Sequence, residues 1–139
     1  MKDNIYTEIL LDEYKHPQNK GEMKDADLVL DGSNTSCGDK ITIYLKIQNG
    51  EIKNISWMGD GCVISQVAVS LLSNKIKNSK LKIKNIGKLN QTDILGLLGI
   101  ESISPGREKC MMLGLETLRK IDLSTPLETS PSTPLETNV

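Results

Sequence analysis

The chain is poor in aromatic residues and in histidine. Its 139 residues include no Phe, one Trp, three Tyr and one His. A core without Phe must be built mainly from Ile, Leu, Val and Met. A single domain of this length can bury such a core without cross-links. The lone His16 is far in sequence from the cysteines, and we expect a surface residue there rather than a ligand.

The chain also lacks an excess of either charge and lacks long hydrophobic runs. Lys and Arg number 17 against 18 Asp and Glu, and no basic stripe is interleaved with aromatics. This balance argues against nucleic acid or an anionic membrane as a partner. No apolar stretch has the length of a signal peptide or of a membrane span. We therefore expect a cytoplasmic protein in a reducing compartment.

Paired cysteines are absent as well. The three cysteines, Cys37, Cys62 and Cys110, are an odd number and form no Cys-x-x-Cys motif. Both features argue against a framework of disulfides. The cysteines are therefore either core thiols or groups that take part in chemistry.

The composition divides the chain into two parts. The hexapeptide Ser-Thr-Pro-Leu-Glu-Thr begins at Ser124 and again at Ser132, and three of the five prolines lie in this stretch. Such a segment buries too little apolar surface to offset the entropy of ordering it. We predict a folded domain over residues 1–122 and a disordered tail over 123–139.

Hydrophobic periodicity predicts an α+β domain, in which a small antiparallel three-stranded sheet packs against several helices. Asn49-Gly50 is a preferred hairpin turn, and a parity shift between Ile52 and Ile55 indicates a bulge. The expected strands cover 28–30, 41–48 and 51–58, and the expected helices cover 3–15, 62–72, 93–98 and 107–120. Glycines at 59 and 61 are expected to end the third strand, and a lysine-rich segment covers 75–88.

The context of each cysteine favours a reactive thiol. Cys37 and Asp39 are two residues apart, so in extended backbone their side chains point to the same side. Cys62 lies at the start of an expected helix, where unpaired N–H groups favour the thiolate. Cys110 follows Arg107 and a lysine, whose charges also favour the thiolate.

Three thiolates and one carboxylate suit a tetrahedral zinc site or an incomplete cage for an iron–sulfur cluster. With zinc, such a site has a formal charge of about −2, which Lys40, Arg107 and Lys109 could offset. The cysteines are, however, 25 and 48 residues apart, which matches no general zinc-binding spacing. The residues alone leave both a shared metal site and incidental core thiols open.

Linked motifs resemble the U-type iron–sulfur cluster assembly family, which includes the NifU N-terminal domain, IscU and SufU. The resemblance covers most of residues 4–121. It comprises an opening helix followed by a Tyr-x-x-Pro-x-Asn-x-Gly segment, then Cys-Gly-Asp, Gly-x-Gly-Cys-x-Ile-Ser and Arg-x-Lys-Cys, which begin at Tyr14, Cys37, Gly59 and Arg107. Residues 66–69 depart from the family's Ala/Ser-rich pattern, which we expect to alter helix packing rather than ligation.

The residue before the third cysteine selects a branch of this family. Scaffold-type IscU proteins have His there, whereas this chain has Lys109. Arg-x-Lys-Cys resembles the SufU branch, whose members bind zinc and accept persulfide sulfur from a cysteine desulfurase. The resemblance implies Cys37, Asp39, Cys62 and Cys110 as metal ligands, with Cys37 as the catalytic sulfur acceptor.

Three hypotheses follow for the function. The first is a zinc-dependent sulfur acceptor. It would act as a sulfurtransferase with a cysteine desulfurase and supply downstream iron–sulfur assembly proteins. The second is a scaffold in which Cys37, Cys62 and Cys110 hold a [2Fe–2S] cluster, with iron in place of zinc, and pass it to apo-proteins. The third is an α+β binding module with incidental thiols.

Overall fold

The computed structural model describes residues 2–34 and 38–121. Cys37 and the predicted disordered tail over 123–139 lie outside these described residues. The described elements are α1 (Lys2–Lys15), β1 (Leu28–Asn34), β2 (Asp39–Gln48), β3 (Glu51–Asp60), α2 (Val63–Ser79), a 3₁₀ helix (Ile83–Lys88), α3 (Gln91–Leu98) and α4 (Pro105–Leu118).

The three strands form one antiparallel sheet in the order β1-β2-β3. Asn49 and Gly50 join β2 to β3 with φ angles of 55° and 76°, which a type I′ turn requires. The register shifts after the pair Lys46–Asn54, where the next pair is Ile47–Ile52, so Lys53 is the bulged residue. The predicted bulge is confirmed, and it lets the β3 isoleucines on both sides of it face the core.

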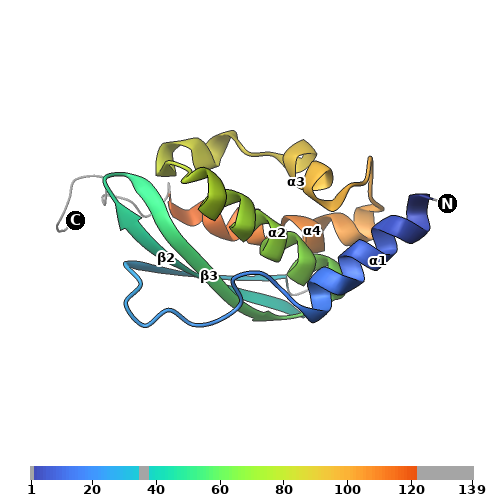
Figure 1. Ribbon diagram of the computed structural model, residues 1–139, viewed down its shortest axis with the longest axis horizontal. Helices are drawn as coiled ribbons and strands as arrows, with labels where there is room; N and C mark the ends of the chain where they lie inside the picture. The colour runs from blue at the N-terminus through green and yellow to red at the C-terminus, as the bar shows by residue number, and fades with distance from the viewer. Residues whose placement is uncertain (1, 35–37, 122–139) are drawn as a thin grey trace.

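Helices α2 and α4 cover one face of the sheet, and α1 and α3 lie outside against α2 (Figure 1). The core between sheet and helices is almost entirely aliphatic, as the absence of Phe predicts, and among the side chains that the structure describes Trp57 is its single aromatic residue. Its fully buried members include Ile43, Leu45, Ile55, Trp57, Ile76 and Leu115. The predicted fold class, an α+β domain with a three-stranded antiparallel sheet, is confirmed.

Several boundaries differ from the sequence prediction, including the end of β1, which is at Asn34 rather than at residue 30. β3 continues through Gly59 to Asp60 because Asp60 still pairs with Lys40 at the start of β2. α2 continues seven residues beyond Leu72 to Ser79, because Ile76 keeps the helical spacing and is completely buried. The lysine-rich segment is therefore the exposed end of a helix followed by a 3₁₀ helix.

The segment after α1 lies along β3. Trp57 N–H donates to the carbonyl of Asn19 (3.0 Å), and Gly21 N–H donates to the carbonyl of Trp57 (2.7 Å). The indole Nε1 of Trp57 donates to the carbonyl of Gln18 (2.8 Å). These three bonds attach the short segment 18–21 to the buried tryptophan and place Lys20 beside its ring.

A membrane-crossing helix would need a longer apolar stretch than any helix in residues 2–34 and 38–121 provides.

Candidate metal centre

Asp39 is the first residue of β2 and is completely buried. Its carboxylate Oδ1 accepts a hydrogen bond from the backbone N–H of Cys62 (3.0 Å). Buried carboxylates are rare in proteins because desolvation is costly, so they are normally held by charge-assisted hydrogen bonds or a cation. The burial of Asp39 is therefore consistent with a carboxylate that binds a cation or a hydrogen-bond donor, rather than with a side chain that only fills space.

Cys62 is the N-cap of α2 and is half-buried. Its Sγ lies 3.8 Å from Asp39 Oδ2 and 3.9 Å from Ser65 Oγ. Ser65 in turn donates to the Cys62 carbonyl (3.0 Å), which closes the first turn of the helix around the cysteine. The prediction that Cys62 opens a helix is confirmed, and the thiol is held next to the carboxylate.

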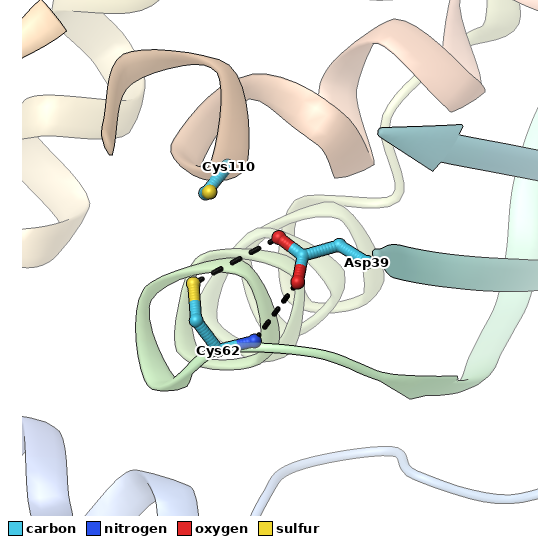
Figure 2. Close-up of side chains that lie close together, drawn as sticks. All are labelled: Asp39, Cys62 and Cys110. Atoms are coloured by element: carbon cyan, nitrogen blue, oxygen red, sulfur yellow. Dashed lines mark hydrogen bonds between the residues drawn. The ribbon is translucent and has the colours of Figure 1, made fainter. Parts of the chain in front are cut away.

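Cys110 lies in the second turn of α4 and is almost completely buried, with 2% of its surface exposed. It points toward Asp39 and Cys62 from the opposite side of the site (Figure 2). Met111 and Met112 after it are buried in the core. The thiol of Cys110 therefore lies on the buried side of the site and not on its exposed side.

These three side chains come from a strand, a helix start and a second helix, yet their ligand atoms all lie within 4.8 Å of one another. Figure 2 shows the Asp39 carboxylate beside the two cysteine side chains, with one oxygen on the Cys62 backbone N–H and the other toward its sulfur. One ion placed among them could contact all three.

Gly61 allows this close approach. Its φ of +150° lies in a region that other residues rarely adopt. A Cβ at this position would lie 2.7 Å from Asp39 Cγ and 2.9 Å from Ser65 Oγ. The glycine therefore makes room for the carboxylate.

The sequence prediction for Cys37 rested on extended backbone between Cys37 and Asp39. Gly38, the residue between them, has a φ of +73°, so the backbone is not extended there and that argument is wrong. The side chain of Cys37 lies outside the described residues. Its place as a fourth ligand stays a prediction.

The cations expected to offset the charge of the site, Lys40, Arg107 and Lys109, are exposed. Within residues 2–34 and 38–121, none of them forms an ion pair. The cation whose contacts lead to the site is Lys20, whose Nζ donates to Gln66 Oε1 (3.2 Å). Gln66 Nε2 donates to the carbonyl of Gly61 (3.0 Å), directly before Cys62.

The sequence prediction did not include Gln66 or Lys20 in the site. It assigned residues 66–69 to helix packing, which is correct for the buried residues 67–69. Gln66 could have been recognised from the sequence, because it is polar and lies four positions after Cys62, which places it one helical turn away. Lys20 carried no such signal, since 42 residues separate it from Cys62.

The donor set fits zinc. Two thiols and one carboxylate are ligand types that zinc accepts, and a fourth ligand would complete the tetrahedron. The site is buried at the junction of sheet and helices, and its carboxylate already has a hydrogen-bond partner to orient it. Asp39, Cys62 and Cys110 are therefore suited to hold such an ion.

Comparison with known proteins identifies relatives over most of the chain. The family model described as the NifU-like N terminal domain matches residues 5–121. The iron-sulfur cluster assembly scaffold protein IscU of Thermotoga maritima is 30% identical, over 84% of this chain and 91% of that protein. The zinc-dependent sulfurtransferase SufU of Bacillus subtilis is 31% identical, over 85% of this chain and 89% of that protein.

Solved structures share the fold. An iron-sulfur cluster assembly scaffold protein for the SUF system from Fervidobacterium islandicum AW-1 aligns with a TM-score of 0.65 and 24% identity, covering 79% of this chain and 90% of that chain. A NifU-like N-terminal domain from Brucella abortus aligns with a TM-score of 0.71 and 15% identity, covering 88% and 98%.

The predicted U-type family is confirmed, and a SufU protein of the predicted branch is among the relatives. The three motifs that carry cysteines all fall within the matched residues. The chain belongs to the NifU-like N-terminal domain family.

Proposed function

We propose that this protein is a zinc-dependent sulfur acceptor of iron–sulfur cluster assembly, which takes persulfide sulfur from a cysteine desulfurase. The observation that carries the proposal is the convergence of Asp39, Cys62 and Cys110 within 4.8 Å. Zinc would be held by these three residues and, as the fourth ligand, Cys37. A zinc ion bound there would keep its cysteine ligands as thiolates.

The burial of the site divides the roles of its residues. Cys110 is buried at the back and would act as a permanent ligand. Asp39 is fixed by the Cys62 backbone N–H and would keep its orientation if a cysteine left the metal. Cys37 lies one glycine before Asp39 in the chain, and we assign it the role of sulfur acceptor.

The transfer step is a thiol–disulfide type exchange. The Cys37 thiolate attacks the outer sulfur of the desulfurase's cysteine persulfide, and a new S–S bond forms at Cys37 Sγ. The S–S bond in the desulfurase breaks, and its cysteine leaves as a thiolate. No external oxidant or reductant is required, and the sulfur then passes to downstream iron–sulfur assembly proteins.

The chemistry also suggests where the protein works. Its cysteines must stay reduced between transfers, which the cytoplasm provides. Two relatives bear on the choice of metal, because the B. subtilis SufU is named as zinc-dependent and the T. maritima IscU is named as a scaffold. We place this chain with the first because Lys109, not His, precedes Cys110.

The second candidate is a scaffold that transiently binds a [2Fe–2S] cluster through the same cysteines and transfers it to apo-proteins. Elemental analysis of the purified protein separates the two functions. We expect about one zinc per chain, no visible absorbance, and a higher rate of sulfide release by a cysteine desulfurase when the protein is added. A protein that accepts a cluster on anaerobic reconstitution and passes it on would overturn the transfer-only proposal.

Single substitutions test the ligand set. We expect Cys37→Ser, Cys62→Ser and Cys110→Ser each to lose zinc and desulfurase stimulation, because a neutral hydroxyl is a poor ligand for zinc. Ser33→Ala, an exposed position on β1, is the matched control and should retain both. If all three cysteine variants kept zinc and sulfur acceptance, the site would not exist.

A further inference from the structure

One peptide bond in the site is held at both ends by side chains. The Gly61–Cys62 peptide has its N–H bonded to Asp39 Oδ1 (3.0 Å) and its carbonyl bonded to Gln66 Nε2 (3.0 Å). Rotation of this peptide would break both bonds at once. Gly61, the first residue of this peptide, has a φ of +150° and no side chain, so backbone rotation there meets little steric resistance.

Lys20 determines which way the Gln66 side-chain amide faces. Its ammonium group can only donate, so the amide oxygen must face Lys20 (3.2 Å). The Gly61 carbonyl can only accept, so the amide NH₂ must face Gly61. Gln66 is 9% exposed, which leaves little water to compete with either bond.

Lys20 is itself held in place although it is exposed. Its Nζ lies 5.2 Å from the centroid of the Trp57 ring, within the range of a cation–π interaction. Trp57 is completely buried, and its backbone and indole bond to the segment 18–21 that carries Lys20. The ammonium group is therefore positioned by the core and not by a flexible loop.

We propose that Lys20 and Gln66 are positioning residues for the metal centre. Together they hold the Gly61–Cys62 peptide, and through it the Asp39 carboxylate and the Cys62 thiol, in the arrangement that binds the ion. Hydrogen bonds linked in such a chain polarise and strengthen one another. The chain begins at the positive Lys20 ammonium and ends at the Asp39 carboxylate. The metal part of the inference rests on the proposed zinc-binding function.

The first experiment tests the peptide itself and needs no metal. Hydrogen exchange of the Cys62 amide is measured by NMR in the metal-free chain. We expect Gln66→Glu and Lys20→Met to reduce its protection at least about tenfold, whereas Lys20→Arg, which keeps a donor, retains it. Unchanged protection in both Gln66→Glu and Lys20→Met would overturn the proposal.

The second experiment measures the zinc dissociation constant by competition with a chromophoric chelator. Partners of metal ligands typically change affinity by 10- to 100-fold, so we expect about a tenfold weaker constant for Gln66→Glu and Lys20→Met. Lys77→Met is the matched control, because Lys77 is also exposed and bonds Asn19 Oδ1 (3.4 Å) in the same segment, but its contact does not lead to Gly61. It should bind zinc as the wild type does.

Thermal unfolding of the metal-free variants separates positioning from general damage. Lys20 is exposed, so Lys20→Met should unfold near the wild-type temperature and still bind zinc more weakly. Equal zinc affinity in Lys20→Met, Lys77→Met and the wild type would overturn the positioning role. A wild-type chain that bound no zinc would instead refute the proposed function, and the amide exchange would still decide the role of Lys20 and Gln66.

Discussion

Gly61→Ala is the substitution for which the structure predicts the sharpest effect. The new Cβ would lie 2.7 Å from Asp39 Cγ and 2.9 Å from Ser65 Oγ, and closer still to an Asp39 oxygen. A backbone φ of +150° adds strain of about 1–3 kcal/mol for a residue with a side chain. Overpacking of a buried site costs about another 1–3 kcal/mol.

The two terms add to a loss of about 2–6 kcal/mol in the free energy of unfolding of the metal-free protein. For a domain of this size, we expect the unfolding temperature to fall by about 10–20 °C. The clash with Asp39 is relieved if its carboxylate moves away from the Cys62 N–H, so zinc binding should be lost as well. Circular dichroism during heating and elemental analysis measure the two effects.

Gly96→Ala is the matched control. Gly96 lies inside α3, and a Cβ there would meet no atom within 4 Å. Alanine is a better helix former than glycine, so this variant should be more stable by about 0.5–1 kcal/mol and keep its zinc. A Gly61→Ala protein with wild-type unfolding temperature and full zinc content would refute the argument that Gly61 makes room for Asp39.

Three further predictions follow from single contacts. Asp39→Asn keeps an acceptor for the Cys62 N–H, so it should weaken zinc binding at least about tenfold with little change in stability. Asp39→Ala should also lower the free energy of unfolding in urea by about 1–3 kcal/mol. Equal stability of the two variants would count against this prediction. Burial, together with the carboxylates of Glu22 and Asp31, raises the pKa of Tyr44 above its usual value of 10.0. Its contribution to stability is therefore complete below pH 10.0 and is lost as the pH rises through the folded-state pKa, so Tyr44→Phe should flatten the alkaline fall in stability measured by urea titration. Asn90→Ala removes the capping box with Asp93 and should cost about 1 kcal/mol while zinc affinity stays unchanged, which a chelator competition checks.

Much of the fold could be predicted from local patterns. The alternation along β2, the Asn-Gly turn and the parity shift between Ile52 and Ile55 depend on neighbouring residues, and all three agree with the structure. The ends of β3 and α2 could not be predicted in the same way. They depend on the pairing of Asp60 with Lys40 and on the burial of Ile76, which are contacts between distant parts of the chain.

For the metal centre, the sequence by itself determined the candidate ligands through its ordered cysteine motifs, whereas the local chemistry of each cysteine left incidental core thiols open. Only the tertiary structure decided that Asp39, Cys62 and Cys110 meet, since strand pairing and helix packing bring a strand start and two helices together. It also revealed the hydrogen bonds from Lys20 to Gln66 and from Gln66 to the Gly61 carbonyl beside the site. Lys20 and Gln66 are 46 positions apart, and they meet because the segment after α1 lies along β3. No local sequence pattern predicts this contact.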